Sequence, residues 1–259
     1  MTARPPDQRH APSWLARLLA RLRGGARPRV RRHGDYVSLQ FARRQTQSRM
    51  RADDPDYLLV DYTRTMLAAL LLQPAATRVG MIGLGGGSQA KFLHRHAPWL
   101  RVEAVENNPG VLALRDAFAI PPDDARLQVV LGDGATFVAA RPAAFDLLLV
   151  DGYDLGGIPE VLSTPAFYRD CRAALVGGGT LAVNLYGVDH RHHLAQLRAA
   201  FGGGQVAVVE EARMSNRVAF AWRDAGTAAV PVDVVLARLP EAARRQLEEA
   251  FRRAARALP

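Results

Sequence analysis

The 259-residue chain has few cysteines and lysines and no long apolar run, and each shortage excludes something. Cys171 is the single cysteine, so an intrachain disulfide is impossible and a reducing compartment, the cytoplasm, is expected. The longest apolar stretch, residues 66–72, is far too short to span a membrane. We expect no secretory signal, because Arg17, Arg21 and Arg23 interrupt the apolar region near the N-terminus.

Acidic residues are scarce at the front of the chain, where positive charge is concentrated. Residues 1–52 hold thirteen arginines against Asp7 and Asp35, a net charge of +11, whereas the whole chain carries +9. The remainder is therefore close to neutral, at −2. Lys91 is the only lysine, so nearly every basic residue is an arginine. A solvated basic arm is the favoured interpretation, a nucleic-acid partner is not expected, and contact with a membrane surface stays open.

Residues 1–28 are predicted to form a basic, partly disordered arm that contains one short helix. The segment 13–23 begins with Ser13 as an N-cap and places Trp14 and four leucines on one helical face, with arginines on the other. Such a helix can pack on its own domain, bind a partner, or lie on an anionic membrane surface.

Strands and helices alternate from residue 78 onward. Strands are predicted at 78–82, 101–106, 127–131, 145–150 and 180–185, with helices beginning near residues 88, 109, 134, 165 and 190. This alternation predicts right-handed crossovers and a parallel sheet with helices on both faces. Two later strands, 205–210 and 218–222, are joined by about seven residues, too few for a helical crossover, and should pair antiparallel.

The predicted fold class is therefore α/β. It has a doubly wound, mostly parallel, seven-stranded sheet that ends in an antiparallel hairpin, as in S-adenosylmethionine-dependent methyltransferases. A small N-terminal β-region, interpreted as a hairpin, occupies residues 29–60, and the nucleoside-binding catalytic domain occupies 61–224. Residues 225–259 are expected to form a C-terminal extension of one or two exposed helices, with Pro240 starting the second.

A glycine-rich turn links the first strand of the parallel sheet to its helix. Gly83, Gly85 and Gly87 allow positive φ angles and close approach of a ligand, and the helix N-terminus behind them offers free N–H groups. Ser88 stands where a dinucleotide fingerprint requires a third glycine, and the turn lacks the Lys-Ser/Thr ending of a P-loop. A nucleoside ligand is thus favoured over a nicotinamide dinucleotide.

Three consecutive strands end in a carboxylate, namely Glu106, Asp133 and Asp151. Ligands of an open parallel sheet bind outside the carboxyl ends of its strands, where Glu106 can accept hydrogen bonds from ribose hydroxyls. For each aspartate the alternative is a helix or turn cap. Asp151 and Asp154 form a D-x-x-D pair suited to an amine substrate, because one carboxylate can bind an ammonium group while the other accepts a proton.

Other reactive side chains in the sequence are weaker candidates. Asp189, His190, His192 and His193 match no metal-ligand spacing, and we expect a solvated helix start and no metal there. Cys171 has no apparent activating partner and is expected to be a packed thiol.

Taken in order, these segments resemble the spermidine synthase family, the polyamine aminopropyltransferases, over roughly residues 57–187. The resembling segments are Met81–Gly87, Glu106, Gly132-Asp133-Gly134, Val150–Asp154 and Ser163–Tyr168. The resemblance implies decarboxylated S-adenosylmethionine as co-substrate, with no tightly bound cofactor, and a small di- or polyamine such as putrescine as acceptor.

The resemblance also implies a role for each site residue. Glu106 would bind the ribose and Asp133, with Gly134, the adenine end. Asp151 would be the base and Asp154 an amine anchor, while Tyr62 and Tyr153 would contact the substrate. A homodimer stays open.

The chain departs from the family pattern at three places. Gly86 stands where the turn usually carries an Asp that holds the donor amine, Asn108 replaces the second acid after Glu106, and Leu155 replaces a proline. Two further functions therefore stay open: methyl transfer from intact S-adenosylmethionine, and non-catalytic nucleoside binding.

Overall fold

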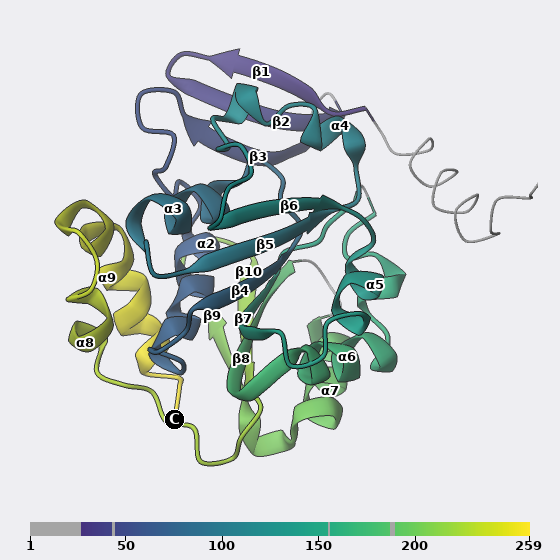
Figure 1. The fold of residues 1–259 in the computed structure, drawn as a ribbon, viewed down its shortest axis with the longest axis vertical. Helices are drawn as coiled ribbons and strands as arrows, with labels where there is room; N and C mark the ends of the chain where they lie inside the picture. The colour runs from purple at the N-terminus through teal and green to yellow at the C-terminus, as the bar shows by residue number, and fades with distance from the viewer. Residues whose placement is uncertain (1–26, 43–44, 155, 187–189) are drawn as a thin grey trace, which may run out of the picture.

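The computed structural model describes residues 27–42, 45–154, 156–186 and 190–259, which form a seven-stranded sheet flanked by helices and a separate three-stranded sheet (Figure 1). The expected amphipathic helix at 13–23 lies outside this part of the chain. Within it, no helix is long and apolar enough to cross a membrane.

The large sheet confirms the predicted topology. Its strands are β4 (Arg78–Ile82), β5 (Arg101–Glu106), β6 (Leu127–Leu131), β7 (Phe145–Val150), β8 (Leu175–Tyr186), β9 (Val206–Glu210) and β10 (Asn216–Trp222). They lie in the order β6-β5-β4-β7-β8-β10-β9, with β10 antiparallel to both β8 and β9 and all other pairs parallel. The chain reverses its direction of progress between β4 and β7, which is where an open sheet of this kind has its ligand crevice.

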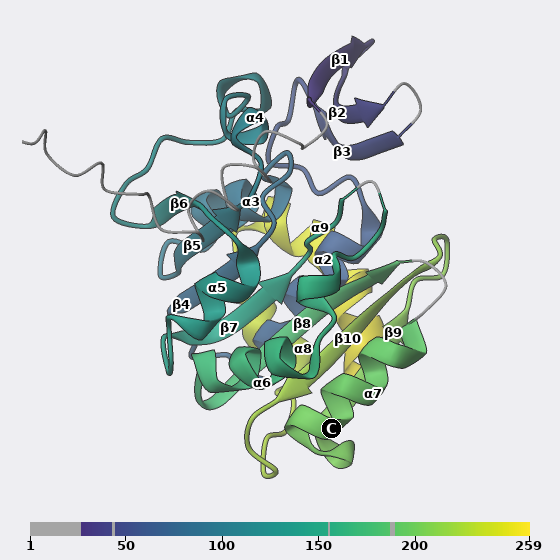
Figure 2. The ribbon, with the colours of Figure 1, turned by 90° about the vertical axis from the view of Figure 1, so that its right-hand side faces the viewer.

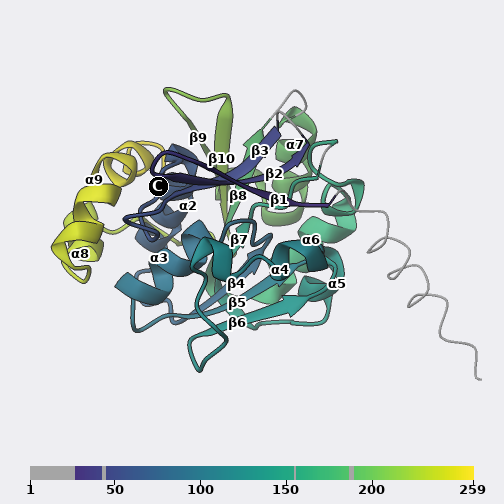
Figure 3. The same cartoon turned by 90° about the horizontal axis from the view of Figure 1, so that it is seen from above.

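Helices cover both faces of the large sheet, as Figure 3 shows from above. One face carries α5 (Gly134–Ala139), α6 (Pro165–Ala174) and α7 (His190–Phe201). The other carries α2 (Asp61–Met66), the 3₁₀ turn η1 (Leu67–Leu71), α3 (Ser88–His96), α4 (Pro109–Leu112), α8 (Val232–Leu236) and α9 (Glu241–Ala255). Shorter 3₁₀ turns are η2 (Asp116–Phe118), η3 (Glu160–Leu162) and η4 (Gly203–Gln205).

Strand β7 shows why the sheet is covered on both sides. Leu147 and Leu149 belong to the apolar core under α2, α3 and α9, whereas Leu148 and Val150 belong to the core under α5, α6 and α7. Side chains alternate between the two faces of a strand, so a continuous apolar run requires burial on both.

The C-terminal helices are not the exposed extension that the sequence suggests. Helix α9 lies outside α2 (Figure 1) and completely buries Ala243, Leu247, Phe251 and Ala254. These residues recur with the period of an α-helix, so one face of α9 completes the core. The expectation of exposure is therefore wrong for that face.

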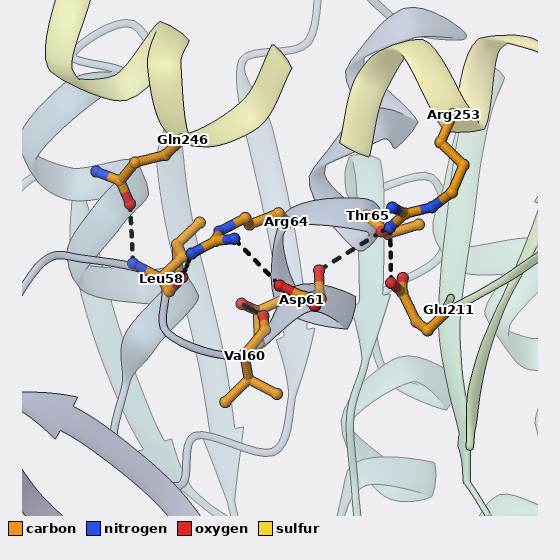
Figure 4. A network of polar contacts seen from close by, with 9 residues as sticks. Leu58, Val60, Asp61, Arg64, Thr65, Glu211, Gln246 and Arg253 are labelled. Atoms are coloured by element: carbon orange, nitrogen blue, oxygen red, sulfur yellow. Dashed lines mark hydrogen bonds and ion pairs between the residues drawn. The ribbon is translucent and has the colours of Figure 1, made fainter. Parts of the chain in front are cut away.

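Polar contacts also hold α9 against the rest of the large-sheet domain (Figure 4). The Arg253 guanidinium donates to Oγ1 of Thr65 on α2, at 2.8 Å, and to the carboxylate of Glu211 after β9, at 2.6 Å. Gln246 accepts from the backbone N–H of Leu58 just before α2, at 2.9 Å. Helix α9 therefore fixes the position of α2.

The N-terminal β-region is a three-stranded antiparallel sheet and not a single hairpin. Its strands are β1 (Arg29–His33), β2 (Tyr36–Ala42) and β3 (Gln45–Arg51), in that order (Figure 2). Val37, Leu39 and Met50 alternate along β2 and β3 and are buried, so one face of this sheet packs on the large-sheet domain.

Lys91 is buried where the small sheet meets α3. Its ammonium group donates to the carbonyl oxygen of Phe118, at 2.7 Å, and lies 3.3 Å from the sulfur of Met50. Burial lowers the pKa of Lys91 to about 8. The contact links β3, α3 and η2 at a single side chain.

Candidate functional site

The glycine turn between β4 and α3 has the backbone that its sequence predicts. Gly83, Gly85 and Gly87 have φ angles of +90°, +53° and +67°, which favour glycine. A Cβ atom at Gly83 would lie 2.2 Å from the carbonyl oxygen of Asp151. The first glycine therefore also allows the ends of β4 and β7 to touch.

Glu106, at the end of β5, bonds to the glycine turn. Its Oε2 accepts from the N–H groups of Leu84, at 3.1 Å, and Gly85, at 3.3 Å, and its Oε1 accepts from that of Asn108, at 2.9 Å. A carboxylate offers about four acceptor positions, so about one stays available to a ligand. Glu106 thus orders the turn, and its contact with ribose stays a prediction.

Asp133 caps helix α5. Its Oδ1 accepts from the backbone N–H of Thr136, at 2.9 Å, and from the Thr136 hydroxyl, at 3.0 Å. The cap is the alternative interpretation of this aspartate, and it leaves Oδ2 for other contacts. Its contact with adenine stays a prediction, as does that of Gly134.

Asp151, at the end of β7, is held through both carboxylate oxygens. Oδ2 accepts from the hydroxyl of Tyr62 on α2, at 2.9 Å, and Oδ1 accepts from the side-chain amide of Asn184 on β8, at 2.8 Å. Burial raises the pKa of Asp151, while these two hydrogen bonds act in the opposite direction. Burial also raises the pKa of Tyr62 well above its usual range, so this phenol is neutral and donates.

A second amide stands behind Asn184, and the sequence analysis missed both. The side-chain Nδ2 of Asn216, on β10, donates to Oδ1 of Asn184, at 2.8 Å, and both residues are buried. Asn184 is the one polar residue within the apolar run Leu181–Leu185, which is a signal that could have identified it. The contribution of Asn216 depends on the antiparallel pairing of β8 with β10, which puts Val218 opposite Asn184.

Asp154 and Tyr153 lie differently from Asp151. Asp154 is exposed, and its Oδ1 accepts from the backbone N–H of Gly156, at 2.7 Å. The Tyr153 hydroxyl donates to the carbonyl oxygen of Asn184, at 2.9 Å, and accepts from the N–H of Tyr186, at 2.5 Å. Tyr153 therefore braces the end of β8, and substrate contacts of both residues stay predictions.

The histidine segment is only partly the solvated helix start that we expect. His193 is buried, and its Nδ1 lies 2.7 Å from the hydroxyl of Tyr168 on α6, so this histidine packs between helices. Asp189 lies outside the described residues. Cys171 is fully buried, which confirms a packed thiol, and burial raises the pKa of its thiol. Among the described residues, no group of three or more possible ligands could hold a metal ion.

The polar residues follow the order of the strands across the large sheet. Asp133, Glu106, the glycine turn, Asp151 and Asn184 stand at the ends of β6, β5, β4, β7 and β8, which are neighbours in that order. The first three form one end of the row, suited to a nucleoside, and the enclosed carboxylate of Asp151 lies next to it. A base beside a nucleoside pocket can take a proton from a substrate that reacts with the bound nucleoside.

Curated proteins are similar to this chain in sequence. The polyamine aminopropyltransferase of Chromobacterium violaceum is 33% identical over 197 residues, which cover 75% of each chain. That of Neisseria meningitidis serogroup B is 33% identical over 178 residues, covering 67% of this chain and 68% of the relative. No protein-family model matches the chain.

Solved structures share the fold. A probable spermidine synthase from Corynebacterium glutamicum superposes with a TM-score of 0.68 at 19% identity, covering 85% of this chain and 83% of that one. A spermidine synthase in complex with the transition-state analogue AdoDATO gives 0.58 at 17% identity, covering 83% and 81%. Human methyltransferase-like protein 13, in complex with SAH, also gives 0.58, at 22% identity, covering 74% and 93%.

Proposed function

This chain belongs to the polyamine aminopropyltransferase family, and on that premise we propose that it transfers an aminopropyl group from decarboxylated S-adenosylmethionine to a di- or polyamine such as putrescine. The observation that carries the proposal is the carboxylate of Asp151, enclosed by Tyr62 and Asn184 beside the glycine turn. The names of the relatives favour this transferase reaction over methyl transfer and over non-catalytic binding.

The donor occupies the nucleoside end of the row of strand ends. Gly83, Gly85 and Gly87 give the ligand access to the backbone, and Glu106 accepts a ribose hydroxyl with its remaining acceptor position. Asp133 receives the adenine amino group. An S-adenosylmethionine-derived co-substrate agrees with the SAH and AdoDATO ligands of the structural neighbours.

Asp151 serves the acceptor amine. The amine nitrogen attacks the methylene carbon next to the sulfonium, a new C–N bond forms, and the C–S bond breaks with its electron pair moving to sulfur. Methylthioadenosine leaves, and the proton from the amine passes to Asp151. The raised pKa of this carboxyl makes it a stronger base, and Tyr62 keeps it oriented.

Gly86 and Ser48 shape the turn from the side of the small sheet. A Cβ atom at Gly86 would lie 2.5 Å from the Ser48 hydroxyl oxygen on β3 and 3.1 Å from the Phe118 ring, so a side chain there would require Ser48 to shift. Because the residue is a glycine, this position supplies no carboxylate for the donor's ammonium group. We infer that the aminopropyl end of the donor contacts fewer carboxylates here than in the usual family pattern. Comparing decarboxylated with intact S-adenosylmethionine as donor is therefore the sharpest test.

The test is a product assay with each donor in turn. Protein, putrescine and decarboxylated S-adenosylmethionine should give spermidine and methylthioadenosine, and Asp151→Asn should lower kcat by about a hundredfold or more as expected for a lost general base. Asp154→Asn is the matched variant, and it should mainly raise KM for the amine. A methylated amine from intact S-adenosylmethionine, or no product from folded protein with several amines, would reject the proposal.

Oligomeric state, membrane contact and cellular location are three further predictions. A homodimer is tested by light scattering of the purified chain, and contact of the 13–23 segment with anionic vesicles by sedimentation. The cytoplasm, expected from the single cysteine, is tested by cell fractionation.

A further inference from the structure

The small N-terminal sheet has a second face, directed away from the catalytic domain. Because side chains alternate along a strand, the buried residues Val37, Leu39 and Met50 place their neighbours on the opposite side. The register aligns that outer face into three rows across the strands. The rows are Arg29–Gln40–Thr46, Arg31–Ser38–Arg49 and His33–Tyr36–Arg51.

This outer face carries positive charge, and none of the residues in its three rows is acidic. Arg29, Arg31 and Arg49 are exposed, and within the part of the chain that the structure describes none has a carboxylate oxygen within 4.0 Å. Arg51 differs, because it is paired with Asp53. Three guanidinium groups without an ion-pair partner among the described residues therefore share one face of the small sheet.

Several arginines elsewhere in the described part of the chain are paired with acids. Arg115 pairs with Asp123, Arg141 with Glu103 and Arg253 with Glu211. Residues 53–259 carry a net charge of −2, so the excess positive charge of the chain lies in residues 1–52. The sequence alone favours a solvated basic arm at the N-terminus. The register of β1, β2 and β3 shows in addition that some of these arginines lie together on one face of a sheet.

The spacing on this face suits an extended polyanion. Arg29 and Arg31 project from one strand about 7 Å apart, and Arg31 and Arg49 lie on strands two positions apart, about 10 Å from each other. The Arg49 guanidinium lies 3.8 Å from the centroid of the Tyr36 ring. A guanidinium stacked on an aromatic ring offers a flat, charged platform on which a nucleobase can stack.

We propose that this basic face binds single-stranded nucleic acid, with phosphates on Arg29, Arg31 and Arg49 and a base against the Arg49–Tyr36 stack. Apart from Tyr36, whose ring is stacked against Arg49, the face offers no apolar side chain for insertion into a membrane. A second copy of this chain would bring like charges together. RNA or single-stranded DNA satisfies both the charge and the stacking surface.

The test measures binding of the full chain to a fluorescein-labelled, mixed-sequence RNA 20-mer by anisotropy, between 50 and 200 mM salt. The double variant Arg31→Glu/Arg49→Glu should weaken binding about twentyfold at 0.1 M salt, because each lost phosphate contact also removes about 0.7 from the salt slope. The pair Arg198→Glu/Arg256→Glu, on α7 and after α9, changes the net charge equally and should leave binding within about twofold.

Further measurements separate the alternatives. Tyr36→Ala, which removes the stacking ring and no charge, should weaken binding while leaving the salt slope unchanged. Spermidine synthesis and the unfolding midpoint should be unaffected by Arg31→Glu/Arg49→Glu, since the outer face lies away from the site. Equal weakening by the control pair, full binding by the double variant, or binding to phosphatidylserine vesicles without RNA binding would overturn the proposal.

Discussion

At the residue scale, the orientation of Asp151 depends on a chain of hydrogen bonds that ends at Asn216. Asn216 donates to Asn184, and Asn184 donates to Asp151, with both links at 2.8 Å. An amide that bonds at both ends cannot exchange its oxygen and nitrogen without losing both contacts. Asn216 is therefore a positioning residue for Asp151, although it touches no reacting atom in the proposed reaction.

Asn216→Ala should lower kcat about tenfold and leave KM for the donor unchanged, because Asn184 loses the partner that orients it. The acid limb of the kcat profile should also move to higher pH, since a weaker bond from Asn184 no longer lowers the pKa of Asp151 as much. Steady-state kinetics across pH give both quantities. Arg217→Ala, which removes the neighbouring ion pair with Glu210, is the control and should change neither.

Tyr62→Phe tests the other hydrogen bond to Asp151. The phenol lowers the pKa of this carboxyl, so its removal should raise that pKa. A base works only when deprotonated, and activity should then disappear at a higher pH on the acid side than in the parent. Tyr36→Phe on the small sheet is the matched variant, and an identical shift there would contradict the assignment.

Lys91 should make the stability of the protein depend on pH. Its pKa is about 8 in the folded chain against 10.5 for a free lysine, so the unfolded chain holds more protons between these values. The free energy of unfolding contributed by Lys91 therefore rises with pH across that window, by about 3 kcal/mol at most.

Urea unfolding of the parent and of Lys91→Met, compared at each pH from 7 to 10, isolates this contribution. Buried Cys171 and Tyr62 have raised pKa values and act in the opposite direction in both proteins, so they cancel in the difference. Lys91→Met should gain relative stability at pH 7 and lose that advantage by pH 10. A difference that does not vary with pH would show that Lys91 is not buried as described.

At the scale of elements, the predicted strands and helices of the parallel sheet are confirmed because their periodicity is strong. β7 is continuously apolar from Leu147 to Val150, and three of the crossover helices begin at a side-chain cap, namely Asn108 before α4, Asp133 before α5 and Thr164 before α6. The sequence predicts a two-stranded hairpin and not the third strand, β1, because the β1 sequence RVRRH has only one apolar residue, Val30. Its pairing with β2, and not its own pattern, makes it a strand.

The burial of one face of α9 has a signal in the sequence that its high charge obscures. Leu247 and Phe251 repeat at helical spacing, but the helix is otherwise rich in charge. What sequence cannot supply is the surface that receives this face, which α2 and η1 provide. The same limit hid Asn216, whose partner lies on another strand.

Arg253→Ala should destabilise the protein by about 3 kcal/mol, since it leaves the Glu211 carboxylate buried without its guanidinium partner. The Glu211 side chain is 1% exposed, and Arg253 is the cation that pairs with it. Arg256→Ala, in the exposed turn after α9, is the control and should change the free energy of unfolding by less than about 0.5 kcal/mol. Urea denaturation of the three proteins measures the difference.

At the scale of the whole molecule, the site is made from strand ends that the topology brings into one row. The sequence correctly indicated which carboxylates end strands, because the strand–turn–helix pattern marks those ends. It could not distinguish Asp151, which two side chains enclose, from Asp154, which is exposed. That difference depends on α2 and β8, which pack around β7 from distant parts of the chain.

The contact between Gly83 and Asp151 limits how the two halves of the site can be changed separately by mutation. Backbone touches backbone there, with no side chain between to be exchanged. The part of the site proposed to bind the nucleoside and the part proposed to bind the amine are thus joined by this backbone contact. To alter the preference for the amine, substitutions should be made at the exposed residues Asp154 and Tyr186, which do not take part in that contact.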